Sequence, residues 1–161
     1  MGISNLSQNK RIINAYAGFA AASSASPQYV SLKNARHVTA VVTFSNNTTV
    51  TGAAITLSQA TAVAGTGAKT LAFTKVWLNS DSGASDALVE TTVSSNTFTF
   101  DDTDSKRGVA VIEIPAESLD TNNGFDCVRV NVANSTAQVV HVTYIVEPRS
   151  IGGTAESHIT D

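Results

Sequence analysis

The stretch RHVTAVVTF at residues 36–44 alternates apolar and polar side chains, and this alternation decides the fold class. In an extended strand, successive side chains point to opposite faces of the sheet. One face of this segment would carry the apolar side chains of Val38, Ala40, Val42 and Phe44. The opposite face would carry His37, Thr39, Val41 and Thr43. The pattern predicts a β-strand with one buried face.

Similar segments follow along the chain. We expect strands within 50–59, 70–79, 88–93, 97–100, 109–114, 125–132 and 140–146, and a short one at 12–16. The near-continuous apolar run 109–114 indicates a central strand. Pro115 suits the first position of one helical turn that ends near Leu119. Asn134-Ser135 fits a tight hairpin turn between the last two strands.

The composition agrees with an all-β chain. The sequence has 20 Thr, 18 Val and 9 Ile, but only 7 Leu, 5 Glu and 5 Lys. The first three residue types favour strands and the last three favour helices. Charged residues make up 14% of the 161 residues, well below the usual ~25%. This composition excludes a coiled coil, a helical bundle and a disordered chain.

We therefore predict an all-β, antiparallel β-sandwich of jelly-roll-like topology with eight or nine strands. The sandwich would span residues 29–147. The polar, small-residue segment 1–28 is expected to form an N-terminal arm, and 148–161 a C-terminal tail.

Several classes of function are excluded by charge and cysteine content. The formal net charge is −3, so we expect no nucleic-acid partner. No run of 18 apolar residues occurs, so we expect no membrane span. The single Cys127 excludes an internal disulfide and a multi-cysteine zinc site. Residues 10–22 loosely resemble a signal peptide, but Asn14 and Gly18 interrupt the apolar core, which favours synthesis in the cytoplasm.

Candidate catalytic residues are few. His37 and His141 fall within expected strands and His158 in the tail, so a catalytic or metal pair is conceivable, but surface histidines are favoured. Glu90, Glu113 and Glu117 could in principle supply a carboxylate pair for glycoside hydrolysis, but the chain has only five Glu and no aromatic-lined stretch, which disfavours this activity. We expect no enzymatic activity and no cofactor.

Two acidic segments are candidate calcium sites. Residues 101–104 carry three aspartates, and 120–126 superficially resembles a calcium loop. In the second segment, Gly124 comes one residue early for an EF-hand, and Asn131 stands where a glutamate is needed. Both segments are better interpreted as turns whose side chains bond their own backbone, so we expect no metal.

The aromatic residues allow a different reading, a sugar-stacking platform. Its members would be Trp77, Tyr16, Tyr29 and Tyr144. Aromatic residues make up only 6% of the chain, and a single tryptophan in a β domain usually lies in the core. We therefore expect Trp77 in the core.

Three stretches carry a resemblance to a known group of proteins. They are YVSLKNARHVT at 29–39, GTGAKTLAFTKVW at 65–77 and DTNNGFDCVRV at 120–130, together with the closing Val142-Thr143-Tyr144. Over residues 29–147, the chain resembles small virion structural proteins of tailed bacteriophages, in particular jelly-roll head decoration, or cement, proteins. Such proteins have no active site.

The resemblance implies a capsid decoration protein that binds the assembled head shell from outside and bridges capsomers. The implied partners are the major capsid protein and further copies of this chain, as a dimer or trimer. We expect shell contact through Lys10, Arg11, Ile12 and Ile13, because only this segment outside the sandwich combines charge with apolar residues. The alternative is a neck, tail or fibre-associated module that binds a partner protein or a glycan.

Overall fold

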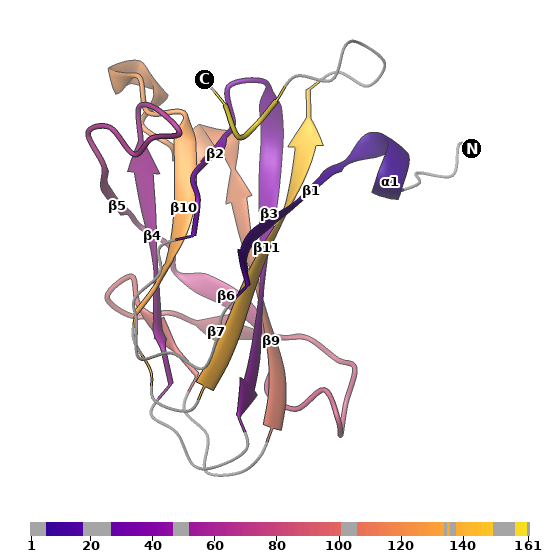
Figure 1. Ribbon diagram of the computed structural model, residues 1–161. Coiled ribbons are helices and arrows are strands. Elements are labelled where there is room, and N and C mark those ends of the chain that lie inside the picture. Colours follow the sequence, from indigo (N-terminus) through magenta and orange to yellow (C-terminus); the bar gives the residue numbers. More distant parts are fainter. Residues whose placement is uncertain are drawn as a thin grey trace.

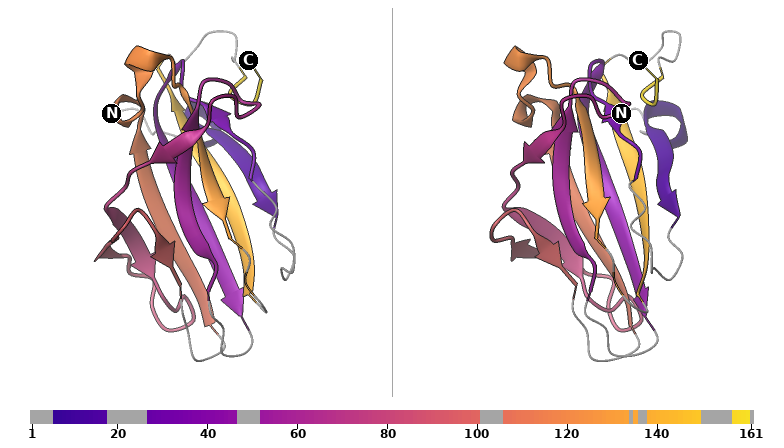
Figure 2. Two further views of the ribbon diagram at one scale, coloured as in Figure 1. Left: turned by 90° about the vertical axis from the view of Figure 1, so that its left-hand side faces the viewer. Right: turned by 60° about the vertical axis from the view of Figure 1, so that its left-hand side comes forward.

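Two antiparallel β-sheets pack face to face in the computed structural model of the chain (Figures 1 and 2). The structure describes residues 6–17, 27–46, 52–100, 106–133, 135, 138–149 and 157–160. The predicted all-β, antiparallel sandwich is confirmed.

The larger sheet has six strands in the order β1-β11-β3-β9-β6-β7. Their bounds are β1 Arg11–Ala17, β11 Gln138–Pro148, β3 Ala35–Asn46, β9 Lys106–Pro115, β6 Lys75–Asn79 and β7 Val89–Thr92. The smaller sheet has the order β2-β10-β4-β5, and β8 also pairs with β4. Its strands are β2 Val30–Ser31, β10 Cys127–Val132, β4 Ala54–Ala60, β5 Lys69–Leu71 and β8 Phe98–Thr99. Short helical segments are α1 Leu6–Asn9, and the 3-10 turns η1 Ala116–Ser118 and η2 Thr121–Asn123.

Two of the connections between the sheets, β3 to β4 and β10 to β11, are matched. β3 pairs with β11 in the six-stranded sheet, while β4, which follows β3, pairs with β10, which precedes β11. The strand pair β3·β11 of one sheet is thereby continued by the pair β4·β10 of the other. The described strands number eleven rather than eight or nine, because β2, β5 and β8 are only two or three residues long.

The apolar side chains of the alternating segment 36–44 are the ones that β3 buries. Val38, Ala40, Val42 and Phe44 are almost completely buried, at 0–2% exposure. Their neighbours on the opposite face of β3 are half-buried. β9 lies between β3 and β6, which confirms the central position predicted from its apolar run. Ala116–Ser118 forms the helical turn predicted after Pro115.

Two expectations about strand connections are wrong. β10 and β11 do not form a hairpin, because β10 pairs with β2 and β4 while β11 pairs with β1 and β3. Asn134, in the expected turn, lies outside the described residues. The expected strand at 70–79 is split: Leu71 packs into the core from the five-stranded sheet, and Val76 from the six-stranded sheet. The chain therefore has to cross between the sheets at residues 72–74.

Part of the expected N-terminal arm belongs to the sandwich. β1 pairs with β11 from Arg11 to Ala17 and is an edge strand of the six-stranded sheet (Figure 1). Ile13 and Ala15 pack against the core, which ties this strand down. At the other terminus, the backbone N–H of Ser31 in β2 donates to the carbonyl of His158 at 2.8 Å. The described end of the tail therefore also lies against the sandwich.

The core fills the space between the two sheets. Its largest fully buried side chains include Tyr144, Ile55, Leu57 and Ile112. At the end of the core near β8, the ring of Phe44 stacks on Phe100 with centroids 5.1 Å apart and meets Phe98 edge-on at 6.2 Å. The opposite face of the six-stranded sheet is turned away from this core.

Candidate interaction surfaces

The six-stranded sheet has one face against the core and one face turned away, which we call the outer face (Figure 2). In its central strands β11, β3 and β9, buried side chains alternate with half-buried or exposed ones that point outward. Strand register places the outward residues of β1, β6 and β7 on the same face. The outer face comprises Ile12, Asn14, His37, Thr39, Val41, Thr43, Ser45, Lys75, Trp77, Glu90, Thr92, Arg107, Val109, Val111, Glu113, Pro115, Val139, His141, Thr143, Ile145 and Glu147.

The middle of the outer face is apolar and rich in β-branched residues. A continuous row across four strands is formed by Thr143, Val41, Val111 and Trp77, each directly opposite the next. Trp77 is 40% exposed. When one face of an antiparallel sheet is solvated, its outward residues are usually polar. An apolar row on such a face is typical of a surface that contacts another protein.

Charged side chains surround this apolar middle, mostly in pairs. The ammonium of Lys75 lies 2.7 Å from a carboxylate oxygen of Glu90. His37 Nε2 lies 2.9 Å from Glu113 Oε2, and the Thr39 hydroxyl donates to the same oxygen at 2.8 Å. Each pair is partly exposed and contributes little to stability on its own. Together they form a polar border around an apolar centre, which is how protein interfaces are usually organised.

Arg107 and His141, both exposed, lie at the end of the outer face opposite Glu113. Among the described residues, the Arg107 guanidinium forms no ion pair. The backbone carbonyl of Arg107 accepts a hydrogen bond from Ser82 N–H at 2.7 Å, so the loop after β6 borders this end. β9 thus presents a cation near its first residue and an anion near its last.

The four predicted shell-binding residues lie together at the start of β1, but they face in different directions. Lys10 forms an ion pair with Glu147 of β11, and this ammonium lowers the pKa of the Glu147 carboxyl below its usual value. Ile12 points outward and is 56% exposed. Ile13 points inward and packs against the core, and Arg11 shares its side of the strand. Of the two isoleucines, only Ile12 is available to a partner.

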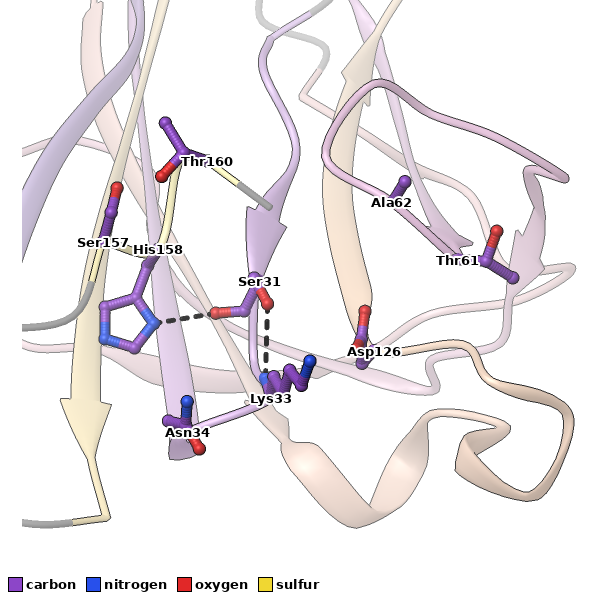
Figure 3. Close-up of a pocket in the computed structure, with 9 residues that line it drawn as sticks. All are labelled: Ser31, Lys33, Asn34, Thr61, Ala62, Asp126, Ser157, His158 and Thr160. Carbon is purple, nitrogen blue, oxygen red and sulfur yellow. Dashed lines mark hydrogen bonds between the residues drawn. The ribbon is translucent and has the colours of Figure 1, made fainter.

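A pocket of about 600 Å³ lies at the end of the sandwich where β2, the loop after β4 and the C-terminal tail meet (Figure 3). The imidazole Nδ1 of His158 lies 3.0 Å from the carbonyl of Ser31, and His158 is only 6% exposed. Lys33 and Asp126 supply one charge of each sign. Among the described residues that line the pocket, none is Phe, Tyr or Trp. The contacts between Ser31 and His158 hold the described end of the tail against β2.

The candidate catalytic residues are not gathered into one site. His37 and His141 lie at different ends of the outer face, and His158 lies in the pocket. Glu90 pairs with Lys75 and Glu113 with His37, while Glu117 is exposed in η1. Within the described residues, no three His, Cys, Asp or Glu side chains are grouped as metal ligands would be. In the same part of the chain, no helix is long and apolar enough to cross a membrane.

The acidic segment 120–126 is organised as a turn. The carboxylate of Asp120 accepts two hydrogen bonds from Asn123 Nδ2 at 2.9 Å, and the Lys69 ammonium lies 2.5 Å from it. These partners, Lys69 first, lower the pKa of Asp120. Gly124 closes the turn with a φ of +80°, a left-handed conformation that glycine adopts without strain. The other acidic segment, 101–104, lies outside the described residues.

The aromatic residues do not form a shared platform, and the expectation that Trp77 is in the core is wrong. Tyr29 and Tyr144 are buried at 4% and 0% exposure, whereas Trp77 lies on the outer face. The side chain of Tyr16 lies outside the described residues. Trp77 is outward because the chain crosses between sheets just before β6, which places Val76 rather than Trp77 in the core.

Sequence reasoning missed the outer face as a surface, although a signal for it was present. Val41 is apolar on the polar side of RHVTAVVTF, and Val109 and Val111 share the strand with the buried Ala110 and Ile112. A strand usually carries apolar residues on both of its faces when both faces of the sheet are covered. The described elements cover only the inner face of this sheet. Val41, Val109 and Val111 on the outer face therefore mark a surface suited to a partner.

Comparisons with known proteins place few constraints on this chain. No protein-family model matches the sequence, and no curated protein matches it. Among solved structures, the chain is similar to the crystal structure of SPBc2 prophage-derived protein YomS, with a TM-score of 0.47 and 12% sequence identity. The alignment covers 86% of this chain and 94% of that one. A likeness of this size carries no argument about function.

Proposed function

We propose that this chain is a structural virion protein of a tailed bacteriophage, a decoration or cement protein on the capsid exterior. It would bind the assembled head shell and stabilise it by bridging capsomers. The resemblance of residues 29–147 to such proteins supports this role, and so does a sandwich whose prominent surfaces suit protein contact rather than chemistry. The expectation of no enzymatic activity is part of the proposal.

The observation that carries the proposal is the N-terminal edge of the six-stranded sheet. Among the strands that the structure describes, β1 pairs with β11 alone, so β1 is an edge strand of the sheet. Leu6 and Ile12 are 49% and 56% exposed and flank Arg11 and the paired Lys10. Exposed apolar side chains beside cations on an edge strand suit a protein partner, through side-chain packing and through strand addition.

The major capsid protein is the partner that this role requires. A shell filled with DNA is under outward load, and a small domain that contacts two neighbouring capsomers adds interface area across their junction. A stable contact typically buries ~1,200–2,000 Å² in total. Weaker contacts suffice where one molecule binds at two points, because the second contact forms at high effective concentration.

The direct test is co-sedimentation of the purified protein with mature phage shells that have been stripped of it. Saturable binding at a fixed ratio to capsid protein, with little binding to unassembled capsid protein, is the expected result. Ile12→Asp should abolish most of this binding. Absence of saturable binding by the wild-type protein would overturn the cement role.

Val89→Asp is the matched control. Val89 is 63% exposed in β7, at the opposite edge of the same sheet, so it tests the same substitution on a comparable edge strand. It should leave shell binding unchanged. If Val89→Asp and Ile12→Asp weakened binding equally, the contact would not be specific to the N-terminal edge. Both variants should first be checked for an unchanged thermal midpoint.

The exposure of Trp77 favours one second candidate, a glycan-binding module of a neck, tail or fibre. Trp77 lies beside the Lys75–Glu90 ion pair, so an aromatic ring and hydrogen-bonding groups occur together. Host surface polysaccharide should then quench or shift the fluorescence of this single tryptophan. An emission spectrum that does not change on saturation with polysaccharide would exclude a glycan site at Trp77.

A further inference from the structure

The outer face is organised in rows that strand register defines. Five successive rows cross β9, β3 and β11, and each row is separated from the next by two residues along the strand. The rows are Arg107–Ser45–Val139, then Val109–Thr43–His141, then Val111–Val41–Thr143, then Glu113–Thr39–Ile145, then Pro115–His37–Glu147. Arg107 is in the first row and Glu113 in the fourth, and the two rows between them carry valine and threonine side chains and His141.

This order makes the face complementary to itself. Consider a second copy turned over by a two-fold axis that lies in the interface, perpendicular to the strands, midway between the second and third rows. The axis places the first row over the partner's fourth row and the second over its third. Arg107 then faces Glu113 of the second copy, Val109 faces Val111, and Val139 faces Ile145. In such an isologous contact, every pair occurs twice.

The alternative two-fold axis, parallel to the strands between β3 and β9, is less favourable. It would place Glu113 over Thr39 of the second copy and Arg107 over its Ser45, so neither charge would face an opposite charge across the interface. Arg107 is exposed and forms no ion pair among the described residues, and Glu113 is exposed beside His37. Charge complementarity therefore selects the axis perpendicular to the strands. Stacked sheets lie about 10 Å apart, a gap that Arg and Glu side chains can bridge together.

The size of the face also suits a dimer. Six strands about 4.8 Å apart and six residue steps of about 3.4 Å, from the first to the fourth row, give an overlap of roughly 29 Å by 20 Å, on the order of 600 Å². A stable interface takes roughly 600–1,000 Å² from each partner. Its centre would be apolar and its charges peripheral, which is the usual composition of such an interface.

We propose that the outer face of the six-stranded sheet binds a second copy of this chain, in a two-fold dimer held by Val109–Val111 packing and two Arg107–Glu113 ion pairs. This dimer goes beyond the cement role and does not depend on it. Ile12 of the edge strand β1 lies at the side of this face, whereas Arg107 and Glu113 lie on β9 and belong to the self-contact alone.

The experiment measures oligomeric state by sedimentation velocity over a range of protein concentrations, and reverses each charge in turn. Arg107→Glu and Glu113→Arg should each raise the dimer dissociation constant by at least about tenfold, since both symmetric pairs become like-charge pairs. Mixing the two variants should restore a heterodimer. In that heterodimer, one contact pairs the two introduced side chains, which carry opposite charges, and the other contact retains the wild-type pair.

Lys33→Glu and Glu117→Arg are the matched controls, because both reverse exposed charges away from the outer face. They should dimerise as the wild type does. Glu113→Gln covers the case in which Glu113→Arg fails to fold, because glutamine preserves the shape and an acceptor for Thr39. Glu113→Gln should also raise the dimer dissociation constant.

A wild-type protein that stays monomeric up to about 100 µM, well above a typical micromolar dissociation constant, would overturn the proposal. So would a wild-type trimer, a dimer that neither charge reversal weakens, or mixed variants that fail to form a heterodimer. Shell binding by Arg107→Glu is scored separately. A monomeric Arg107→Glu variant that still binds shells would support both the dimer and the cement role. An Ile12→Asp variant that dimerises but no longer binds shells would show that the two contacts are separate.

Discussion

The phenolic oxygen of Tyr144 accepts a hydrogen bond from the backbone N–H of Val130 at 2.9 Å. Tyr144 lies in β11 of one sheet and Val130 in β10 of the other, so this bond joins the two sheets through the core. β2 pairs with β10 only at Cys127 and Val128, so the N–H of Val130 lies beyond its last pair. Burial raises the pKa of the Tyr144 phenol far above its usual value, so the hydroxyl stays neutral.

Replacing Tyr144 by phenylalanine should therefore destabilise the sandwich while leaving its shape unchanged. The substitution leaves a buried N–H without an acceptor, which costs about 1–3 kcal/mol. Equilibrium unfolding in urea measures the loss. Thr99→Val, which removes a hydroxyl from an exposed residue of β8, should change the free energy of unfolding by less than about 0.5 kcal/mol. Equal effects of the two substitutions would contradict this role for Tyr144.

Gln138 is a second polar group on which the core depends. It is 0% exposed; its Oε1 accepts from the Ala53 N–H at 2.8 Å, and its Nε2 donates to the Phe100 carbonyl at 3.1 Å. Gln138→Leu should lower the free energy of unfolding by about 2–4 kcal/mol, because two buried backbone groups lose their partners. Gln28→Leu, at an exposed position, is the control. A loss below about 1 kcal/mol for Gln138→Leu would show that the backbone groups find other partners.

Gly52 is required because another part of the backbone approaches it closely. A Cβ at this position would lie 1.9 Å from the carbonyl oxygen of Phe100, which no side-chain movement can relieve. We expect Gly52→Ala to lower the free energy of unfolding by more than about 2 kcal/mol. At Gly83, a Cβ would meet only the flexible carboxylate of Asp81 at 3.1 Å. Gly83→Ala should therefore cost clearly less, and thermal unfolding of both variants makes the comparison.

The Lys69–Asp120 ion pair should make stability depend on pH in the acid range. Folding lowers the pKa of Asp120 below its ordinary value of 3.8, so the folded state binds this proton less readily than the unfolded state. The stabilisation is fully present above the unfolded pKa and is lost as the pH falls through the folded pKa.

Asp120→Asn isolates this contribution. The difference in unfolding free energy between wild type and variant should be constant from about pH 5 to pH 7 and should shrink below about pH 4. In a Lys69→Gln background, the same substitution should show a much weaker pH dependence, because the main cause of the shift has been removed. A difference that is independent of pH in both backgrounds would contradict the assignment.

Features with short sequence separation could be predicted from the sequence. The two-residue period identified the buried face of β3 from Val38 to Phe44, and the position of Pro115 identified the turn at Ala116–Ser118. The apolar run 109–114 indicated that β9 is central. Each rests on a signal contained within a few residues, because alternation and turn formation are properties of the local backbone.

Only the tertiary structure decided which strands share a sheet and what lies on the outer face. The turn signal at Asn134-Ser135 suggested a hairpin, yet β10 and β11 lie in different sheets. Trp77 is outward and lies in one row with Val111 and Val41, because pairing among β3, β9 and β6 joins residues that are far apart in the sequence. The sequence by itself determined which residues can form strands and which faces can be buried. The pairing of those strands was decided by long-range packing, because each strand gains stability only from partners that the local sequence does not specify.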